Sequence, residues 1–232
     1  MDLMTSAFWF ALGSIILTNI ILSGDNAVVI AMASRNLPPK NQKQAIFWGS
    51  ALAIILRLVL TVVAVELLTL PYLKIVGAVL LVYIGVQLLA EGDDDEEQEA
   101  KDHLWGAIKT ILIADLVMSL DNVVAVAAAA QKGPENTRFL LLALGLGISI
   151  PLIIFGSTLL LKIMDRFPII VVLGAALLGL LAGEMLVTDP AIHSSIEHIP
   201  QIDNIAIVVG IAIVVGLGMY LKRKNASPAT SE

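Results

Sequence analysis

The sequence predicts an all-α polytopic membrane protein, with seven transmembrane helices arranged as a 3+3 inverted repeat plus one extra helix. Hydrophobic residues make up 58% of the 232 positions and charged residues only 15%. This composition is too apolar for the wetted surface of a soluble domain. A short polar phrase also occurs twice, each time inside an apolar stretch. The composition indicates the class, and the duplication indicates the internal symmetry.

Seven apolar stretches are long enough to cross a bilayer, which requires about 20 residues of helix. The first stretch lacks the basic leader of a cleaved signal peptide, so we expect it to remain as a membrane helix. Together the stretches form a single membrane domain over residues 1–232. They lie at residues 6–34, 43–69, 72–90, 104–131, 138–163, 168–187 and 204–222.

The duplicated phrase has an Asp-Asn pair at its centre. Asp25 and Asn26 in the first copy match Asp121 and Asn122, which follow 96 residues later. An aspartate at the centre of a membrane helix costs about 2.5 to 3.5 kcal/mol even on lenient insertion scales. Two of them in matched settings therefore indicate a shared binding site or pathway. Two further pairs stand at the same offset: Asn19 with Asp115, and Ser23 with Ser119.

An acidic segment at 91–103 divides the chain into two halves, 6–90 and 104–187. Each half holds three spans, and an odd number of spans turns the second copy upside down in the membrane. Inverted repeats place a shared site near the bilayer midplane, where broken helices free backbone groups for ions. Gly24 suits such a break. We expect the segment 91–103 to be a solvated cytoplasmic linker and the span 204–222 to be a packing helix.

The distribution of Lys and Arg predicts the orientation. With the N-terminus outside, ten basic residues fall on the inner side and three on the outer side, with mid-span Arg57 left out of the count. Inner loops carry the excess of basic residues in membrane proteins. We therefore expect a multi-pass protein of the inner (plasma) membrane, with its N-terminus outside and its C-terminus in the cytoplasm.

The polar residues inside the spans offer carboxylate and carboxamide oxygens. Such ligands suit hard or borderline divalent cations, and they leave Mn²⁺, Mg²⁺ and Ca²⁺ open as cargo. The chain has no cysteine, which excludes thiolate metal sites, and it has no basic patch for nucleic acid. We expect no cofactor, and the sequence does not specify an oligomeric state. The candidate metal ligands are Asp25, Asn26, Asp115, Asp121 and Asn122, with Asn19, Ser23 and Ser119 as possible extra ligands.

Other charged residues could balance charge or line an exit path. Arg57 lies mid-span, where an unpaired cation is costly, so we expect it to pair with an intramembrane carboxylate and to balance the charge of the empty site. Glu66 and Glu184 lie near the outer ends of their helices, where they could serve as exit-path residues or simply reach the interface. Five outer residues form a cluster that could be a weak metal site, although ordinary loop polarity is the simpler interpretation: Asp189, His193, Glu197, His198 and Asp203.

Two function classes fit the paired aspartates. The first is a transporter that exports a divalent cation. The second is an intramembrane aspartyl hydrolase in which Asp25 and Asp121 share a proton. The Asn that follows each Asp favours the transporter, because a metal site uses a carboxamide oxygen and a catalytic dyad has no need of one. We therefore expect that the protein is not an enzyme.

The two motifs resemble those of the TerC family of integral membrane proteins, in particular its short bacterial branch called YjbE. The sequence Ala-Met-Ala-Ser-Arg-Asn-Leu-Pro-Pro at 31–39, the three-plus-three-plus-one arrangement and the acidic central loop carry the same resemblance. It spans residues 6 to about 222. It implies a group of exporters with inverted repeats and the export of manganese from the cytoplasm, with Asp25, Asn26, Asp121 and Asn122 as the motif residues. An accessory membrane protein linked to metal or tellurite resistance remains an open alternative.

Overall fold

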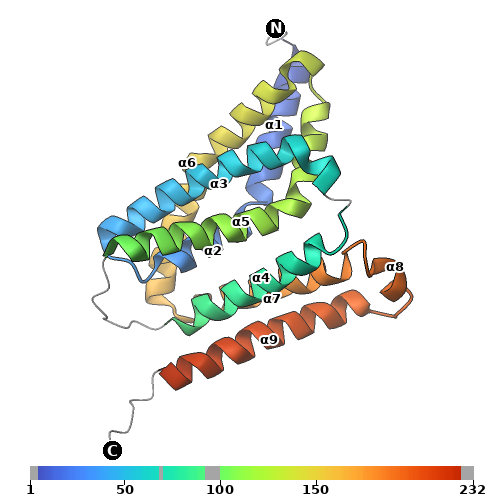
Figure 1. The fold of residues 1–232 in the computed structure, drawn as a ribbon. Coiled ribbons are helices and arrows are strands. Elements are labelled where there is room, and N and C mark those ends of the chain that lie inside the picture. Colours follow the sequence, from blue (N-terminus) through green and yellow to red (C-terminus); the bar gives the residue numbers. More distant parts are fainter. Residues whose placement is uncertain (1–4, 68–69, 92–99, 226–232) are drawn as a thin grey trace, which may run out of the picture.

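The computed structural model describes residues 5–67, 70–91 and 100–225, apart from the side chains of 62–67, 100–102 and 121. Within these residues all the regular elements are helices (Figure 1). They are α1 (Ser6–Ile21), α2 (Gly24–Ser34), α3 (Pro39–Leu67), α4 (Leu73–Ala90), α5 (Ala100–Gln131), the 3₁₀ turn η1 (Glu135–Thr137), α6 (Arg138–Arg166), α7 (Ile169–Val187), α8 (His193–Ile196) and α9 (Ile202–Asn225).

The described helices agree with the spans expected from hydropathy. Within the described residues, six helical segments are long and apolar enough to cross a membrane, and α1 and α2, which are bent by 47°, pass the same test together, which gives seven if the pair is counted as one span. The prediction of an all-α polytopic membrane protein is therefore confirmed. Most of the predicted linker at 91–103 lies outside the described residues, and its last residues, from Ala100 on, already belong to α5.

The bend between α1 and α2 lies at Leu22 and Ser23, just before the predicted position at Gly24. Leu22 and Ser23 leave the helical conformation, with φ/ψ of −85°/5° and −114°/2°. Gly24 opens α2, and Asp25 lies in the first turn of that helix. A carboxylate in this position is favoured by the positive end of the helix dipole. The break thus places the first Asp-Asn motif at a helix start, as part of a discontinuous span.

The second copy of the motif lies in a helix without such a break. Helix α5 keeps its helical hydrogen bonding from Ala100 to Gln131, although its ribbon changes direction in the second half (Figure 1). Leu120 stands where the first copy has Gly24, and leucine has a much higher helix propensity than glycine. This difference in one residue fits a broken span in the first half and a bent span in the second.

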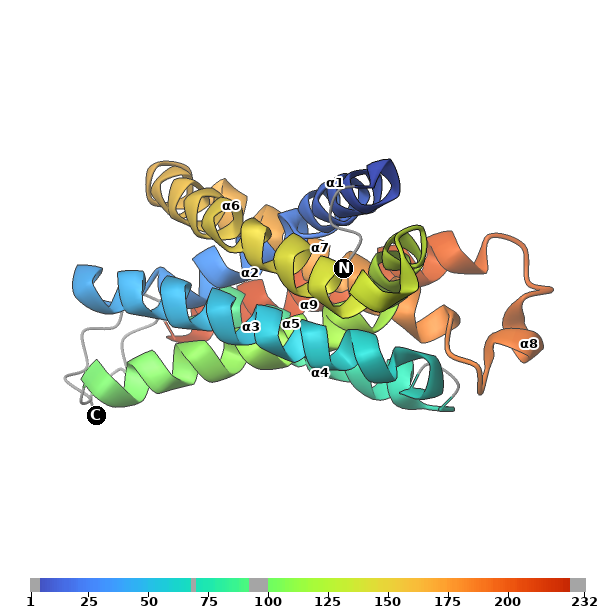
Figure 2. The ribbon, with the colours of Figure 1, turned by 90° about the horizontal axis from the view of Figure 1, so that it is seen from above.

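The helices form two groups that lie side by side. Helices α3 and α5 run alongside each other while α1 and α2 pack on α6 (Figure 2). The second group consists of α4, α7 and α9. Helices α7 and α9 approach very closely. A Cβ placed on Gly179 would lie only 2.6 Å from the carbonyl oxygen of Gly210. Glycines at this interface therefore allow direct backbone contact between the two helices.

One contact occurs twice with the two halves exchanged. Gly49 of α3 packs against Ile111 of α5, and Gly145 of α6 packs against Ile15 of α1. Both the glycines and the isoleucines are 96 residues apart. The motif offset therefore extends to the packing between helices.

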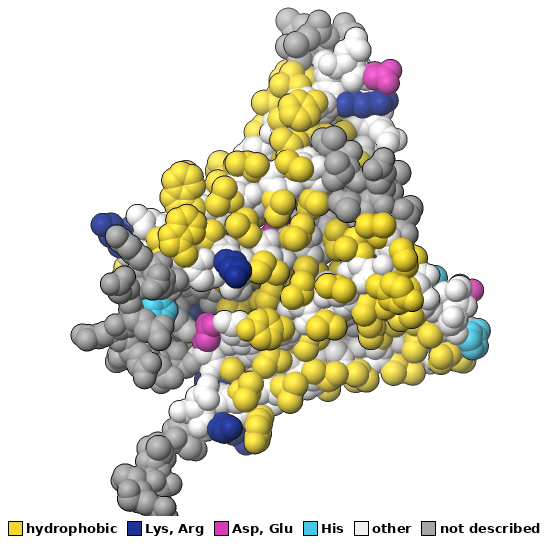
Figure 3. Space-filling view, in the orientation of Figure 1, with side chains coloured by type: hydrophobic (Ala, Val, Ile, Leu, Met, Phe, Trp, Pro, Cys, Tyr) yellow, Lys and Arg dark blue, Asp and Glu magenta, His cyan; other side chains and the backbone are white. Residues whose placement is uncertain are grey.

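The exterior is apolar and the interior holds polar groups. Large hydrophobic side chains such as Phe10, Tyr83 and Phe155 are 65–69% exposed, and hydrophobic side chains cover much of the face shown in Figure 3. Buried among the helices are Arg57 and Asp115. An exposed apolar surface of this extent suits contact with lipid, and the buried charges mark the candidate site.

Candidate cation site

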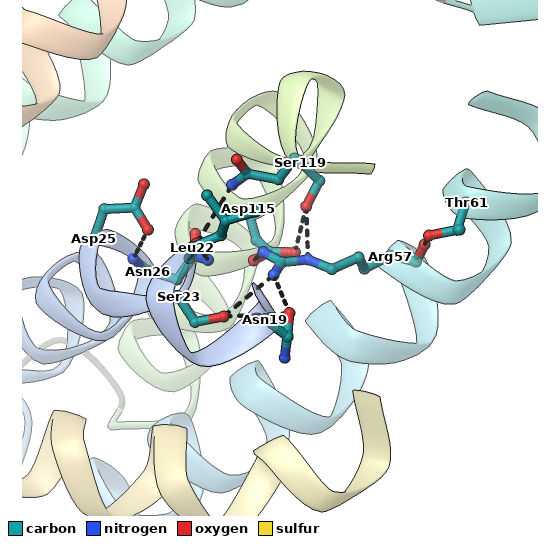
Figure 4. Close-up of polar contacts among 10 residues, drawn as sticks. Asn19, Leu22, Ser23, Asp25, Asn26, Arg57, Thr61, Asp115 and Ser119 are labelled. Carbon is teal, nitrogen blue, oxygen red and sulfur yellow. Dashed lines mark hydrogen bonds and ion pairs between the residues drawn. The ribbon is translucent and has the colours of Figure 1, made fainter. Parts of the chain in front are cut away.

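Arg57 of α3 lies at the centre of a buried polar network, with 1% of its surface exposed. Its Nη2 is 2.6 Å from Oδ1 of Asp115 in α5, which forms an ion pair. Its Nε donates to the hydroxyl oxygen of Ser119, one turn further along α5, at 3.0 Å. Asp115 and Ser119 therefore hold one side of the guanidinium (Figure 4).

The other side of the guanidinium faces the end of α1. Nη1 of Arg57 donates to Oδ1 of Asn19 at 2.9 Å and to the hydroxyl oxygen of Ser23 at 3.3 Å. Asn19 and Ser23 are the positions that match Asp115 and Ser119 at the offset of 96 residues. The guanidinium is therefore held by two residues from each half of the chain.

The two serines make the same internal contact in each half. Ser23 donates its hydroxyl to Oδ1 of Asn19 at 3.4 Å, and Ser119 donates to Oδ2 of Asp115 at 3.2 Å. In both cases the partner lies four residues earlier, so one turn of helix brings the two side chains together. All four of these residues were candidate metal ligands in the sequence. In the structure they contact Arg57.

The break between α1 and α2 joins the two Asp-Asn motifs. The carbonyl of Leu22, left without a helical partner at the end of α1, accepts from Nδ2 of Asn26 and from Nδ2 of Asn122, each at 3.4 Å. Carbonyls at a helix end need such outside partners. The two motif asparagines, one from each half, therefore meet at one carbonyl.

Asn26 also presents a buried oxygen without a donor. The residue is 3% exposed, and its Oδ1 has no hydrogen-bond partner within the part of the chain that the structure describes. The bond from Nδ2 to the Leu22 carbonyl fixes which end of the amide is the oxygen. Leaving a buried acceptor unsatisfied costs about 1–3 kcal/mol. A cation at this point would remove that cost.

Asp25 lies beside Asn26, and Figure 4 shows its carboxylate apart from the Arg57 guanidinium. Its Oδ1 accepts the backbone N–H of Asn26 at 2.7 Å, which fixes the carboxylate at the start of α2. The side chain is half-buried. Arg57 already pairs with Asp115, so Asp25 is a carboxylate that stands apart from that ion pair.

Several predicted site residues lie away from this network, or their side chains are outside the described residues. The side chains of Asp121 and Glu66 are outside the described residues, although Asp121 lies in α5 directly before Asn122. Glu184 is exposed near the end of α7. Among the described side chains, no three His, Cys, Asp or Glu residues form a metal-binding group.

The outer histidine cluster is exposed. His193 Nε2 is 3.8 Å from Glu197, and both side chains are more than half exposed. His193 Nδ1 contacts the carbonyl oxygen of Val187 at 2.9 Å, which ties the ring to the end of α7. His198 is exposed as well. The contact between His193 and Glu197 therefore has the geometry of a solvated surface contact.

Asp189 was grouped with the outer polar cluster in the sequence, but in the structure it is a buried capping carboxylate. It is fully buried and follows α7, where it accepts backbone N–H bonds from Tyr72, Lys74, Ile75 and Ala191 at 2.8–3.2 Å. Burial raises the pKa of the Asp189 carboxyl, but these four bonds lower it further, and the net pKa lies below the usual value. Asp189 therefore caps the start of α4 as a carboxylate and joins α4 to α7.

A cavity of about 330 Å³ opens near the C-terminal end of α2, whereas Asp25 lies at the start of that helix. Arg35, directly after α2, borders it and donates to the carbonyls of Leu88 and Glu91 at the end of α4. Ten residues of helix separate Arg35 from Asp25, or about 15 Å at 1.5 Å per residue. The cavity therefore lies at one end of the molecule, away from the Asp-Asn motifs. Its lining residues are Arg35, Asn36, Leu89, Glu91, Met164, Asp165, Pro168, Val171, Val172 and Lys222.

Comparisons with known proteins agree with this architecture. The membrane protein YjbE of Bacillus subtilis (strain 168) is 43% identical over 197 residues, which cover 82% of this chain and 88% of that relative. YceF, from the same organism, is 26% identical over 53% of this chain and 52% of its own length. The inner membrane protein YoaE of Escherichia coli (strain K12) is 27% identical over 81% of this chain and 39% of its own length.

No solved structure matches the chain. The model of the TerC family of integral membrane proteins matches residues 4–226, which is nearly the whole sequence. With its bent first span, its two Asp-Asn motifs and its apolar exterior, this chain is an integral multi-pass membrane protein that belongs to the TerC family.

Proposed function

We propose that this protein is a transporter that exports a divalent metal cation, with Mn²⁺ as the favoured cargo, through a site built from the two Asp-Asn motifs. The observation that carries the proposal is the buried Oδ1 of Asn26, which has no hydrogen-bond partner among the residues that the structure describes. It lies beside the Asp25 carboxylate at a helix break. The same break binds Asn122 of the second motif through the Leu22 carbonyl.

The charges near the site support a dication. Arg57 neutralises Asp115, which leaves the two motif aspartates, Asp25 and Asp121, as the carboxylates of the proposed site. Two carboxylates balance one divalent cation, and matched charge is required where water is scarce. We propose that Asp25 in α2 and Asp121, which precedes Asn122 in α5, supply the two carboxylates of the cargo site.

The chemistry of the donors supports a hard or borderline metal. Carboxylate and amide oxygens are ligands of Mn²⁺, Mg²⁺ and Ca²⁺, and the C-terminal end of α1 adds the negative end of a helix dipole. Discontinuous membrane helices bind ions in this way. An aspartyl hydrolase would give no role to the unpartnered Asn26 oxygen. The resemblance to TerC-family exporters supports Mn²⁺ and outward transport.

The proposed transporter has two inverted halves in the plasma membrane. Support comes from the offset of 96 residues, which relates both the Asp-Asn motifs and the exchanged glycine–isoleucine contacts. The positive-inside rule places the N-terminus outside. On this orientation the cavity bordered by Arg35 and Lys222 faces the cytoplasm, where the cargo would be collected.

The test is a flux assay in vesicles that contain the purified protein and a Mn²⁺-sensitive dye. Asp25→Asn removes one charge with little change of shape, and we expect it to abolish Mn²⁺ flux while the protein remains folded. Asp203→Asn is the matched control, because Asp203 is an exposed residue in the first turn of α9. Wild-type flux in the Asp25→Asn variant would overturn the assignment.

A further inference from the structure

The oxygens around the Arg57 guanidinium form a cage that suits a cation. Four side chains supply them: Asn19 Oδ1 and Ser23 Oγ lie 2.9 and 3.3 Å from Nη1, Asp115 Oδ1 lies 2.6 Å from Nη2, and Ser119 Oγ lies 3.0 Å from Nε. Each of these residues is buried. Oxygen donors without sulfur or imidazole are the ligands of hard cations.

The two serine hydroxyls of the cage donate to other residues of the cage. Ser23 donates its proton to Asn19, and Ser119 donates its proton to Asp115. The lone pairs of both serine oxygens are thereby left to face the guanidinium. The four cage oxygens that contact the guanidinium therefore act as acceptors toward it.

The cage is matched between the two halves, but its occupant is not. Its four ligands are two pairs at the offset of 96 residues. The position 96 residues after Arg57 is Ile153, a buried apolar residue of α6. The guanidinium therefore enters a matched cage from one half only, on the side chain of α3.

The cage carries a single negative charge, that of Asp115. An occupant with one positive charge balances it, whereas a dication would leave an uncompensated charge in a buried place, which is costly. The charge of the cage therefore fits a monovalent cation and distinguishes it from the proposed divalent cargo site at Asp25.

We propose that this cage is a site for a monovalent alkali cation, Na⁺ or K⁺, which the tethered Arg57 guanidinium permanently occupies. The Arg57 side chain, which extends from α3, thus joins the α1–α2 break to α5, as a bound ion would. The protein then needs no monovalent ion to complete its polar centre. This inference does not require the protein to be a transporter, because binding of an ion in the cage can be measured without any transport.

Removal of the guanidinium should convert the cage into an alkali-ion site. Arg57→Met keeps an apolar stem of similar reach and removes the charge. We expect the purified variant to bind about one radioactive Na⁺ per chain, with K⁺ and Li⁺ as competitors that show which ion is preferred. Wild-type protein and Arg57→Lys should show no such binding, because a tethered cation remains.

The matched control removes the charge of the cage as well. Arg57→Met combined with Asp115→Asn keeps the shape of the cage without its negative charge, and we expect Na⁺ binding at least tenfold weaker than in Arg57→Met. Unfolding temperature provides a second readout. Arg57→Met should be stabilised by NaCl or KCl relative to choline chloride at equal ionic strength, and the double variant should not be.

Two results would overturn the inference. One is a folded Arg57→Met variant that binds neither Na⁺ nor K⁺. The other is an Arg57→Met variant that stays unfolded in all three salts while Arg57→Lys folds, because a free cation should replace the tethered one. Manganese flux tests the two proposals apart. If Arg57→Met binds no Na⁺ while the wild type shows Asp25-dependent flux, only the cage proposal is wrong. If Arg57→Met binds Na⁺ while the wild type shows no Asp25-dependent flux, only the transport proposal is wrong.

Discussion

Asn26 and Asn122, which are 96 residues apart in the sequence, donate their side-chain amides to the same backbone carbonyl, that of Leu22, at 3.4 Å each. Neither bond is short, but both converge on a group that became available because α1 ends at Ile21. The break in the first span therefore provides the point at which the two motifs meet.

Asn26→Ala tests the role of the unpartnered oxygen. The variant loses a bond of 3.4 Å to Leu22 and also removes a buried acceptor without a donor. These two effects oppose each other, so we expect the free energy of unfolding to change by less than about 1 kcal/mol. Manganese flux should nevertheless fall roughly tenfold or more. Normal flux with normal stability would show that the oxygen is not a ligand.

Asp115→Asn tests the buried ion pair. The substitution leaves Arg57 charged and 1% exposed, so we expect destabilisation of about 3–5 kcal/mol. Adding Arg57→Met should recover much of that loss, because no buried charge then remains. Unfolding of the three variants and the wild type in denaturant gives the coupling free energy. Additive effects of the two substitutions would contradict a direct pair.

Asp189 should make stability depend on pH in the acid range. Its folded pKa lies below the usual value of 3.8, so its contribution is fully present above pH 3.8 and is lost as the pH falls through the folded pKa. Asp189→Asn should lower the free energy of unfolding by roughly 2 kcal/mol near neutrality and flatten its acid dependence. Unfolding temperatures as a function of pH measure both effects. Asp203→Asn, on the exposed surface of α9, should leave the acid dependence unchanged.

The α7–α9 interface should not tolerate a side chain at Gly210. A Cβ there would overlap the backbone of Gly179, whereas a Cβ on Gly216 of the same helix would meet nothing within 4 Å. Gly210→Val should therefore loosen α9 from α7 and lower the unfolding temperature. Gly216→Val should have little effect. Limited proteolysis of the connection between α7 and α9 gives a second measure, and equal behaviour of the two variants would contradict the close approach.

The sequence predicted the spans because hydropathy is a local property. The seven expected stretches correspond to α1–α2 and the six further spans, and Gly24 marked the bent span to within two residues. Gly24 itself sits in open space, since a Cβ there would meet nothing within 4 Å. Its signal therefore came from helix propensity.

The ion-pair and hydrogen-bond partners of the buried polar residues could not be predicted from hydropathy. The sequence indicated that Arg57 needs a carboxylate, but it also assigned Asp115 to the metal. The choice among intramembrane acids depends on how α3 aligns with α5, which periodicity does not specify. The capping role of Asp189 was missed for a related reason. Its cap depends on the left-handed conformation of Tyr72, with φ of 68°, far away in the sequence.

The most direct test of the account is the binding of Mn²⁺ to purified protein, measured by electron paramagnetic resonance. We expect about one bound Mn²⁺ per wild-type chain, and affinities roughly tenfold or more weaker for Asp25→Asn and Asn26→Ala. Asp203→Asn should bind as the wild type does. Wild-type affinity in both motif variants would contradict the claim that the break between α1 and α2 binds the metal.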